Sequence, residues 1–332
     1  MKTIVDLKKV GGLTKFYGIL GEPLSKTEDY IRALLRSDNK EIEEAALYLL
    51  DSGGKRLRPG LLLLSGYCGN YDEDKLIPLA AAVEIIHMAS LVHDDIVDET
   101  PLRRGRPTIA KDKGKQTALV TGNFMLTKAI GAILSLEDPA IRTASLHTAK
   151  EMCRGEFSQL EARKSPDFDT DHYLLRVKQK TANLISAACE IGARAANAED
   201  SKIEAIKKFG EKIGIAFQIT DDILDYTANT EKFGKAVGSD ITEGLATMPL
   251  ICAWQKGKNK DAIRSLFQQG RNSQKAVKEL ISLVEANDGT KEAAAIAQTY
   301  IQEAKECLDC IEDNEIREAF EEIADFILAR NL

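Results

Sequence analysis

Helical periodicity constrains the fold of this 332-residue chain more than any other feature. Apolar residues recur every three to four positions in nearly every segment, which is the pattern of amphipathic helices. Alternating β-branched runs are few and no Asn-Gly hairpin occurs, so strand signals are nearly absent. Because 44% of the residues are hydrophobic, the chain can bury a large core. We therefore predict a single all-α domain over residues 1–332, built as one large helical bundle.

Gly, Pro and charged residues mark the breaks between the expected helices. The periodic segments that predict helices are residues 42–50, 58–67, 77–97, 118–136, 141–161, 172–195 and 203–226. Residues 100–115 and 227–248 are rich in Gly and charge and are predicted to be loops. Polar positions on long helices point into the centre of such bundles, where metal sites are built.

Two aspartate clusters each close an apolar helical run. Both have the pattern D-D-x-x-D, and their aspartates are Asp94, Asp95 and Asp98 in the first and Asp221, Asp222 and Asp225 in the second. Residues four apart share a helix face, so the outer aspartates of each cluster point the same way. Such carboxylates repel one another unless cations separate them, and their hard oxygens suit Mg²⁺ that bridges to phosphate. The pattern predicts two facing carboxylate ledges that hold a diphosphate through Mg²⁺; the alternative is two solvated acidic helix ends.

Composition excludes several other classes of protein. The net charge of −7, from 45 basic and 52 acidic residues, repels polyanions, so we expect no nucleic-acid partner. The six cysteines are scattered, and the C-x-x-C pair Cys307 and Cys310 lacks the second pair that a zinc site needs. Residues 1–9 lack the apolar segment of a signal peptide. The longest apolar segment, 117–136, is interrupted by Asn123 and Lys128, so we expect a cytoplasmic protein without a membrane-spanning helix.

A series of short motifs surrounds the two clusters. In chain order they are Gly53-Gly54-Lys55-Arg56-Leu57-Arg58-Pro59, residues 84–93, Arg103-Arg104-Gly105, Lys180-Thr181-Ala182, Gln218, Gly234-Lys235 and Gly238-Ser239-Asp240. This series resembles the trans-isoprenyl diphosphate synthases, or polyprenyl synthetases, and most of all their medium- and long-chain members. The resemblance implies the isoprenoid synthase fold, with a central cavity between the two aspartate helices. It also implies Mg²⁺-dependent head-to-tail condensation of isopentenyl diphosphate with an allylic diphosphate.

The resemblance also implies a role for each motif residue. About three Mg²⁺ ions would be bound by Asp94, Asp98 and Asp221, with Asp95, Asp222 and Asp225 in support. The isopentenyl diphosphate would be held by Lys55, Arg58, His87 and Arg104, and the allylic diphosphate by Arg103, Lys180 and Lys235. Oxygens for the carbocation would come from Thr181, Gln218 and the backbone near Lys180, and the departing diphosphate would take the final proton. The start of a helix at residues 55–58 suits phosphate, because free backbone N–H groups and cationic side chains both favour it.

Side-chain size before the first cluster predicts the product length. Ala89 and Ser90 lie five and four residues before Asp94, where short-chain members carry bulky aromatic side chains. Two small residues leave a deep apolar tunnel open, and Ile86 would form the next floor. We therefore predict a product longer than C15.

Three alternatives remain open at this point, together with the oligomeric state. The pair His93-Asp94 is compatible with an HD-type metal phosphohydrolase, and a class I terpene cyclase shares the metal logic but does not need Lys55, Arg58 and His87. A catalytically weak subunit of a heterodimeric synthase is the third, since Leu245 stands where the family often has Lys. The resemblance implies a homodimer or a heterodimer with a small subunit, and the apolar segment 118–136 offers an interface.

Overall fold

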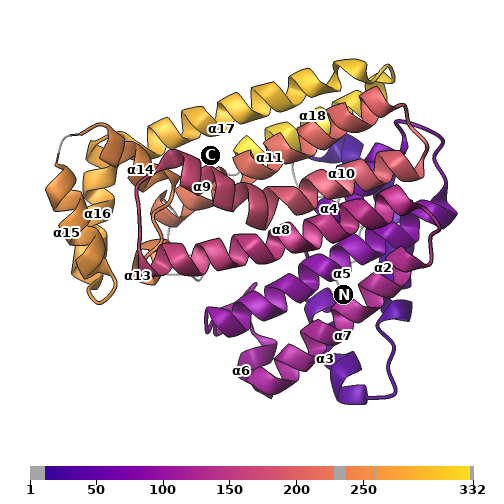
Figure 1. The fold of residues 1–332 in the computed structure, drawn as a ribbon, viewed down its shortest axis with the longest axis horizontal. Coiled ribbons are helices and arrows are strands. Elements are labelled where there is room, and N and C mark those ends of the chain that lie inside the picture. The colour runs from indigo at the N-terminus through magenta and orange to yellow at the C-terminus, as the bar shows by residue number, and fades with distance from the viewer. Residues whose placement is uncertain (1–11, 228–236, 258, 330–332) are drawn as a thin grey trace. The chain divides into compact units, whose positions relative to one another are not determined.

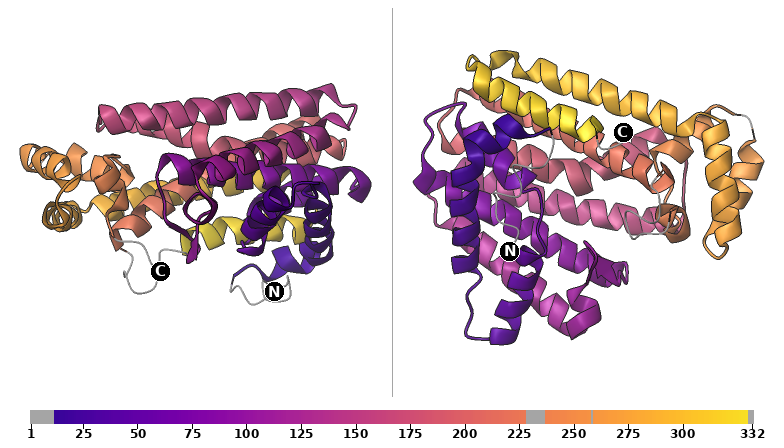
Figure 2. Two further views of the ribbon diagram at one scale, coloured as in Figure 1. Left: turned by 90° about the horizontal axis from the view of Figure 1, so that it is seen from below. Right: turned by 180° about the vertical axis from the view of Figure 1, so that it is seen from behind.

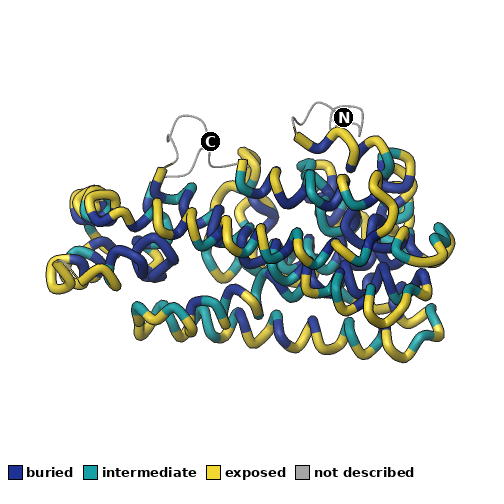
Figure 3. The backbone as a smooth tube through the Cα atoms, turned by 90° about the horizontal axis from the view of Figure 1, so that it is seen from above, coloured by how far each residue is buried: buried dark blue, intermediate teal, exposed yellow. Residues whose placement is uncertain are grey.

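The computed structural model describes residues 12–227, 237–257 and 259–329 (Figure 1). In these ranges the regular secondary structure is helical except for one short ribbon, in which β1 (Leu102–Arg103) pairs antiparallel with β2 (Arg106–Pro107). The prediction of an all-α fold is confirmed. Buried and exposed positions alternate along most of the helices, as the burial colouring in Figure 3 shows.

The chain divides into two compact units, each made of segments that are distant in sequence. Unit 1 comprises the described residues of 1–146, 187–207 and 310–323, and unit 2 those of 147–186, 208–309 and 324–332. The prediction of a single domain stays a prediction.

Unit 1 is built around one long buried helix. Its complete helices are α2 (Thr14–Leu34), α3 (Lys40–Asp51), α4 (Leu57–Gly66), α5 (Glu73–Val97), α6 (Ile109–Lys113) and α7 (Lys115–Leu134). The central helix is α5, which packs against α7, α4 and α2 and is buried on several faces from Leu76 to Asp95. Local sequence sets the helix starts: Asn39 caps α3 by accepting from the backbone N–H groups of Glu41 and Ile42, and Asp72 caps α5 in the same way.

Unit 2 contains the later helices and a second core. Its complete elements are α9 (Thr170–Val177), the π-helical turn η1 (Lys178–Ala182), α13 (Ser239–Glu243), α14 (Met248–Gln255), α15 (Lys260–Gly270), α16 (Gln274–Ala286) and α17 (Gly289–Glu306). Elements that continue from one unit into the other are α8 (Pro139–Lys164), α10 (Asn183–Ala195), α11 (Asp200–Thr227), the 3₁₀ turn η2 (Cys307–Cys310) and α18 (Asn314–Ala329). The core of unit 2 includes Tyr173, Ile219, Met248 and Phe267. The helices α15 and α16 pack side by side as a hairpin, drawn in orange in Figure 2.

Two helices are long and apolar enough to cross a membrane by length and composition alone. They are α5 and α7, and 61% of the apolar window of α5 but only 39% of that of α7 is buried inside the structure. The burial of α5 is that of a core helix. The exposed part of α7 carries large apolar side chains, namely Leu119, Val120, Ile130 and Leu134, each about half exposed. That neither helix spans a membrane stays a prediction.

Candidate active site

The first aspartate cluster lies at the C-terminal end of α5 in unit 1. Asp94 and Asp98 are half-buried, as expected for two residues on one face, whereas Asp95 is 4% exposed. The Arg103 guanidinium donates from Nε to both Asp95 oxygens, at 2.9 and 3.0 Å, and its Nη2 lies 2.8 Å from Oδ1. Asp95 therefore holds Arg103 beside the cluster, so this arginine is placed by the same helix that carries the predicted metal ligands.

The loop before α4 is fixed by a buried arginine. Gly53 and Gly54 have φ of +84° and +155°, and Arg56 itself is in the left-handed region at +50°. Arg56 is 5% exposed and forms ion pairs with Glu28 (2.8 Å) and Glu84 (3.0 Å). It also donates to the Leu50 carbonyl at 2.9 Å. Arg56 is therefore an internal anchor, which leaves the neighbouring Lys55 and Arg58 in half-buried positions.

His87 on α5 contacts this loop through Arg58. The Arg58 Nη1 and the His87 Nε2 are 3.1 Å apart. An arginine can only donate, so Nε2 must accept and the imidazole must be neutral, with its proton on Nδ1. Burial, and then the positive charges of Arg58, Arg104 and Arg103, lower the pKa of His87 well below its ordinary value.

Arg104 joins the same group of cations. Its Nη1 donates to the Ser52 hydroxyl at 3.2 Å. A Cβ added at Gly54 would lie 3.2 Å from the Arg104 guanidinium and 3.0 Å from that of Arg56, so a side chain there would crowd both guanidinium groups. Unit 1 therefore brings together Arg58, His87 and Arg104, three of the four residues predicted for isopentenyl diphosphate. The fourth, Lys55, lies on the same loop, and its carbonyl accepts from the Tyr17 hydroxyl at 2.7 Å.

In unit 2, Lys180 and Thr181 lie on the π-helical turn η1. Two glycines permit the close packing of this turn. A Cβ at Gly155 on α8 would lie 2.5 Å from the Lys180 backbone nitrogen, and one at Gly214 on α11 would lie 2.6 Å from the Ala182 Cα. π-Helical turns occur often at functional sites, because the additional residue redirects side chains. The Lys180 ammonium forms an ion pair with Glu156 of α8 at 2.6 Å.

The second aspartate cluster on α11 is hydrogen-bonded to this turn. The Thr181 hydroxyl donates to Gln218 Oε1 at 2.9 Å, and Gln218 Nε2 donates to Asp222 Oδ1 at 3.0 Å. The other Asp222 oxygen accepts from the Tyr173 hydroxyl at 2.5 Å. Asp222 is 3% exposed, and burial raises its pKa to about 6.

Asp225 and Asp221 differ from this buried carboxylate. Asp225 caps α13: it accepts from the Ser239 backbone N–H (3.1 Å), the Ser239 hydroxyl (2.7 Å) and the Asp240 N–H (3.0 Å). Asp221 is half-buried. In both clusters, then, the aspartates predicted to support the metal are held by protein groups. The metal roles themselves stay predictions.

The donor chemistry of these residues fits Mg²⁺. Within residues 12–227, 237–257 and 259–329, no group of three His, Cys, Asp or Glu side chains forms a metal site by itself. Mg²⁺ does not need such a group, since it retains several waters and is usually bound by one or two carboxylates plus substrate phosphates. A pair of half-buried carboxylates one turn apart, such as Asp94 and Asp98, meets that requirement.

Two other predicted features have different outcomes. Lys235, with Gly234, lies outside the described residues. Leu245 follows α13, is 6% exposed and donates its backbone N–H to the Asp240 carbonyl at 2.8 Å. Its side chain is therefore buried.

Sequence reasoning missed the residues that hold the predicted ones in place. Arg56 is paired with Glu28 and Glu84, Glu156 holds Lys180, and Tyr173 holds Asp222. Glu156 and Tyr173 lie outside the sequence motifs, whereas Arg56 and Glu84 each lie inside one. The sequence signal for Glu84 was a single charged residue within an apolar segment.

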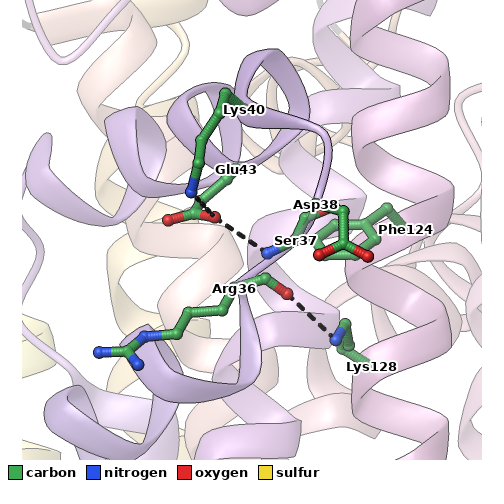
Figure 4. Close-up of a pocket in the computed structure, with 7 residues that line it drawn as sticks. All are labelled: Arg36, Ser37, Asp38, Lys40, Glu43, Phe124 and Lys128. Atoms are coloured by element: carbon green, nitrogen blue, oxygen red, sulfur yellow. Dashed lines mark hydrogen bonds and ion pairs between the residues drawn. The ribbon is translucent and has the colours of Figure 1, made fainter.

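Unit 1 also has a polar pocket of ≈ 660 Å³ that includes none of the predicted site residues (Figure 4). Its lining residues are Arg36, Ser37, Asp38, Lys40, Glu43, Phe124 and Lys128. Most of their polar groups are already engaged with one another: Glu43 accepts from the Ser37 N–H and the Lys40 ammonium, and Lys128 donates to the Arg36 carbonyl. The pocket therefore shares no lining residue with the candidate active site.

Comparison with known proteins identifies the family. The sequence model of the polyprenyl synthetase family matches residues 39–284, so this chain belongs to that family. It is 36% identical to heptaprenyl diphosphate synthase component 2 of Geobacillus stearothermophilus over 319 residues, which cover 96% of this chain and 99% of that protein. It is 33% identical to geranylgeranyl diphosphate synthase of Methanosarcina mazei over 296 residues, covering 88% and 90%.

A solved structure agrees with the fold. The polyprenyl synthase of Caulobacter crescentus, crystallised with calcium and isoprenyl diphosphate, superposes with a TM-score of 0.90 at 30% identity, covering 96% of this chain and 98% of that one. The prediction of the isoprenoid synthase fold is confirmed. The chain is an isoprenyl diphosphate synthase, a prenyltransferase, and the HD-type phosphohydrolase and terpene cyclase interpretations are set aside.

Proposed function

We propose that this chain is a Mg²⁺-dependent trans-polyprenyl diphosphate synthase that extends an allylic diphosphate with isopentenyl diphosphate beyond C15. The proposal rests on the observation that α5 carries residues of two different sites. This helix presents Asp94 and Asp98 at its C-terminal end, and two turns earlier His87, which is bonded to Arg58. Seven residues at 1.5 Å each separate His87 from Asp94 by about 10 Å along the helix. One helix thus carries both a carboxylate pair for metal and a cationic site for a second diphosphate.

The cationic site suits isopentenyl diphosphate. Arg58 and Arg104 offer charged N–H donors to phosphate oxygens, and both approach His87, which stays neutral. A neutral imidazole with its proton on Nδ1 adds a donor without adding a charge. Lys55 on the same loop supplies a further cation.

The allylic diphosphate would be held by the other group of cations, Arg103, Lys180 and Lys235. In the reaction its C–O bond breaks, the double bond of isopentenyl diphosphate forms the new C–C bond, and a proton leaves to the departed diphosphate. Mg²⁺, when bound, supplies positive charge that stabilises the leaving group. Thr181 and Gln218 oxygens face the developing carbocation, where oriented dipoles favour positive charge.

We base the product length on side-chain size near the first cluster. Ala89 is fully buried, and the hydroxyl of Ser90 donates to the His87 carbonyl at 2.8 Å, so neither side chain is a bulky stopper. Relatives at similar identity include synthases named for heptaprenyl and for geranylgeranyl products, so identity alone does not decide the length. We propose products of about C25 to C50, because each added isoprene must bury about five more carbons at roughly 0.8 kcal/mol per CH₂.

Removal of single carboxylates tests the metal assignment. Asp94→Ala and Asp221→Ala should each lower the rate at least about a hundredfold, which corresponds to ~2.7 kcal/mol of barrier. Glu99→Ala is the matched control, because Glu99 directly follows the first cluster but is exposed and paired with Lys115. Steady-state rates of the purified variants, with and without EDTA, are the measurement. Turnover that EDTA leaves undiminished would contradict the proposal.

A further inference from the structure

Three hydrogen bonds join four residues of unit 2 into one network: Thr181 to Gln218, Gln218 to Asp222, and Tyr173 to Asp222. Thr181 and Gln218 are assigned to the carbocation and Asp222 to support of the metal, whereas Tyr173 has no assigned role. Tyr173 comes from α9, 49 residues before Asp222, and is 2% exposed. A buried hydroxyl at the end of such a network needs a reason, because a polar group costs free energy inside a core unless it is bonded.

The hydrogen-bond network determines which way the Gln218 amide points. An ionised carboxylate can only accept hydrogen bonds, so the –NH₂ group of Gln218 must face Asp222. The carbonyl Oε1 must then face the opposite way, where it accepts from the Thr181 hydroxyl. This is the orientation in which Gln218 presents an oxygen, rather than an N–H group, towards a carbocation.

The Asp222 carboxylate is held in turn by Tyr173. Its Oδ2 accepts from the Tyr173 hydroxyl at 2.5 Å, whereas the Met248 backbone N–H is at 3.5 Å, the outer limit for a hydrogen bond. Without the hydroxyl, Oδ2 would have its best remaining donor in Met248, and the carboxylate could rotate towards it. Rotation of Asp222 would release Oδ1 from the Gln218 amide.

We propose that Tyr173 is a positioning residue for the reaction: through Asp222 it fixes the orientation of the Gln218 amide. The inference rests on the proposed function, since it assigns Gln218 to the carbocation. Tyr173 touches neither substrate nor metal in this account. Its effect should therefore appear in kcat and not in substrate binding.

Tyr173→Phe removes the hydroxyl and little else. The ring stays to fill the core, and the Arg176 guanidinium, 5.5 Å from the ring centroid, keeps its aromatic partner. Tyr226→Phe is the matched control: Tyr226 is also buried and lies on α11, but its hydroxyl pairs with Thr247 and not with the carboxylate. Both variants lose one buried hydroxyl, so a purely structural effect would be similar in the two.

The experiment is a double-mutant cycle with steady-state kinetics on the full chain. Tyr173→Phe should lower kcat about tenfold and leave both KM values and the half-saturating Mg²⁺ concentration within about twofold, whereas Tyr226→Phe should stay within about twofold of wild type. In a Gln218→Ala background, adding Tyr173→Phe should lower kcat by less than about twofold further, because Tyr173 acts through the Gln218 side chain that is already removed. Thermal unfolding checks that all variants are folded.

Several results would overturn the inference alone, with wild type active: equal losses in the two tyrosine variants, a full tenfold loss in the Gln218→Ala background, or a raised Mg²⁺ requirement in Tyr173→Phe. A wild-type chain that makes no polyprenyl diphosphate would overturn the proposed function, and this inference with it.

Discussion

Individual charged residues in this protein divide into those that hold the structure and those that we propose bind substrate or metal. Arg56 and Arg58 are two residues apart, yet Arg56 is enclosed by Glu28, Glu84 and the Leu50 carbonyl, whereas Arg58 contacts His87. The motif allowed Arg58 and His87 to be predicted from sequence. The enclosure of Arg56 was not predictable, because both of its carboxylate partners are 28 residues away and come from different helices.

The low pKa of His87 has a consequence for stability. The folded protein keeps His87 neutral, so the unfolded chain binds a proton there more readily. Stability from this group is present above the unfolded pKa, about 6.5, and is lost as the pH falls below it. The free energy of unfolding of wild type should therefore fall between pH 7 and 5 relative to that of His87→Gln, by at most ~1.4 kcal/mol per pH unit. Denaturant titration at several pH values measures it.

The comparison of wild type with His87→Gln isolates the contribution of His87 to the free energy of unfolding. The raised pKa of Asp222 acts in the opposite direction, but it is present in both proteins and cancels. His172→Gln is a sign control, because the bond to Asp167 raises the pKa of the exposed His172 and its removal should act the other way. Parallel pH profiles for wild type and His87→Gln would show that His87 is not held neutral.

At the scale of elements, periodicity predicted most of the long helices. It missed the short helices α6 and α13, which lie inside the segments 100–115 and 227–248 that were predicted as loops, and it missed one π-helical turn. Segments 77–97 and 203–226 were predicted as helices, and the structure has α5 over Glu73–Val97 and α11 over Asp200–Thr227. The segment 172–195 was predicted as one helix, but it is interrupted by the π-helical turn Lys178–Ala182. One additional residue in a turn barely disturbs an apolar pattern, and the glycines that permit this turn lie on other helices. The hydrogen bond from Tyr173 to Asp222 could not be predicted either, because the two residues are far apart in the sequence.

Alanine at those glycines should disturb the turn that carries Lys180 and Thr181. A Cβ at Gly155 or Gly214 would lie 2.5 or 2.6 Å from backbone atoms of η1, which cannot rotate away as a side chain can. We expect Gly155→Ala and Gly214→Ala to lower kcat about tenfold or more and to destabilise the fold by roughly 1–3 kcal/mol. Rates and thermal unfolding of each variant measure both effects.

Gly18 on α2 supplies the control, because a Cβ there would meet nothing within 4 Å. Gly18→Ala should be neutral or stabilise by about 0.5–1 kcal/mol, as alanine favours helix over glycine. If Gly155→Ala behaved like Gly18→Ala, the close packing of η1 would have no role in the reaction.

At the scale of the whole molecule, an exposed apolar face remains to be explained. Leu119, Val120, Ile130 and Leu134 on α7 are 48%, 48%, 52% and 54% exposed. The segment 118–136 was predicted to form a dimer interface, and several exposed large apolar side chains on one helix favour a contact with another protein. We propose a homodimer, or a heteromer of the kind that relatives named as a component or a subunit imply for themselves.

Charge on this face should separate the subunits. Ile130→Glu should move the sedimentation of the purified chain from dimer to monomer, because a buried unpaired carboxylate costs several kcal/mol. Leu102→Glu is the control, since Leu102 is equally exposed, at 50%, but lies on β1. Wild type that sediments as an active monomer of 36.5 kDa would contradict the prediction.

The length of the product tests the central claim most directly. Purified wild type should be incubated with farnesyl diphosphate, isopentenyl diphosphate and Mg²⁺, and its products measured by mass spectrometry. We expect a distribution of about C25 to C50 for wild type. In Ala89→Phe we expect a shift to C20 or to unextended farnesyl diphosphate, because the ring replaces a small, fully buried side chain. Failure of wild type to elongate farnesyl diphosphate, or termination at C20, would contradict the account.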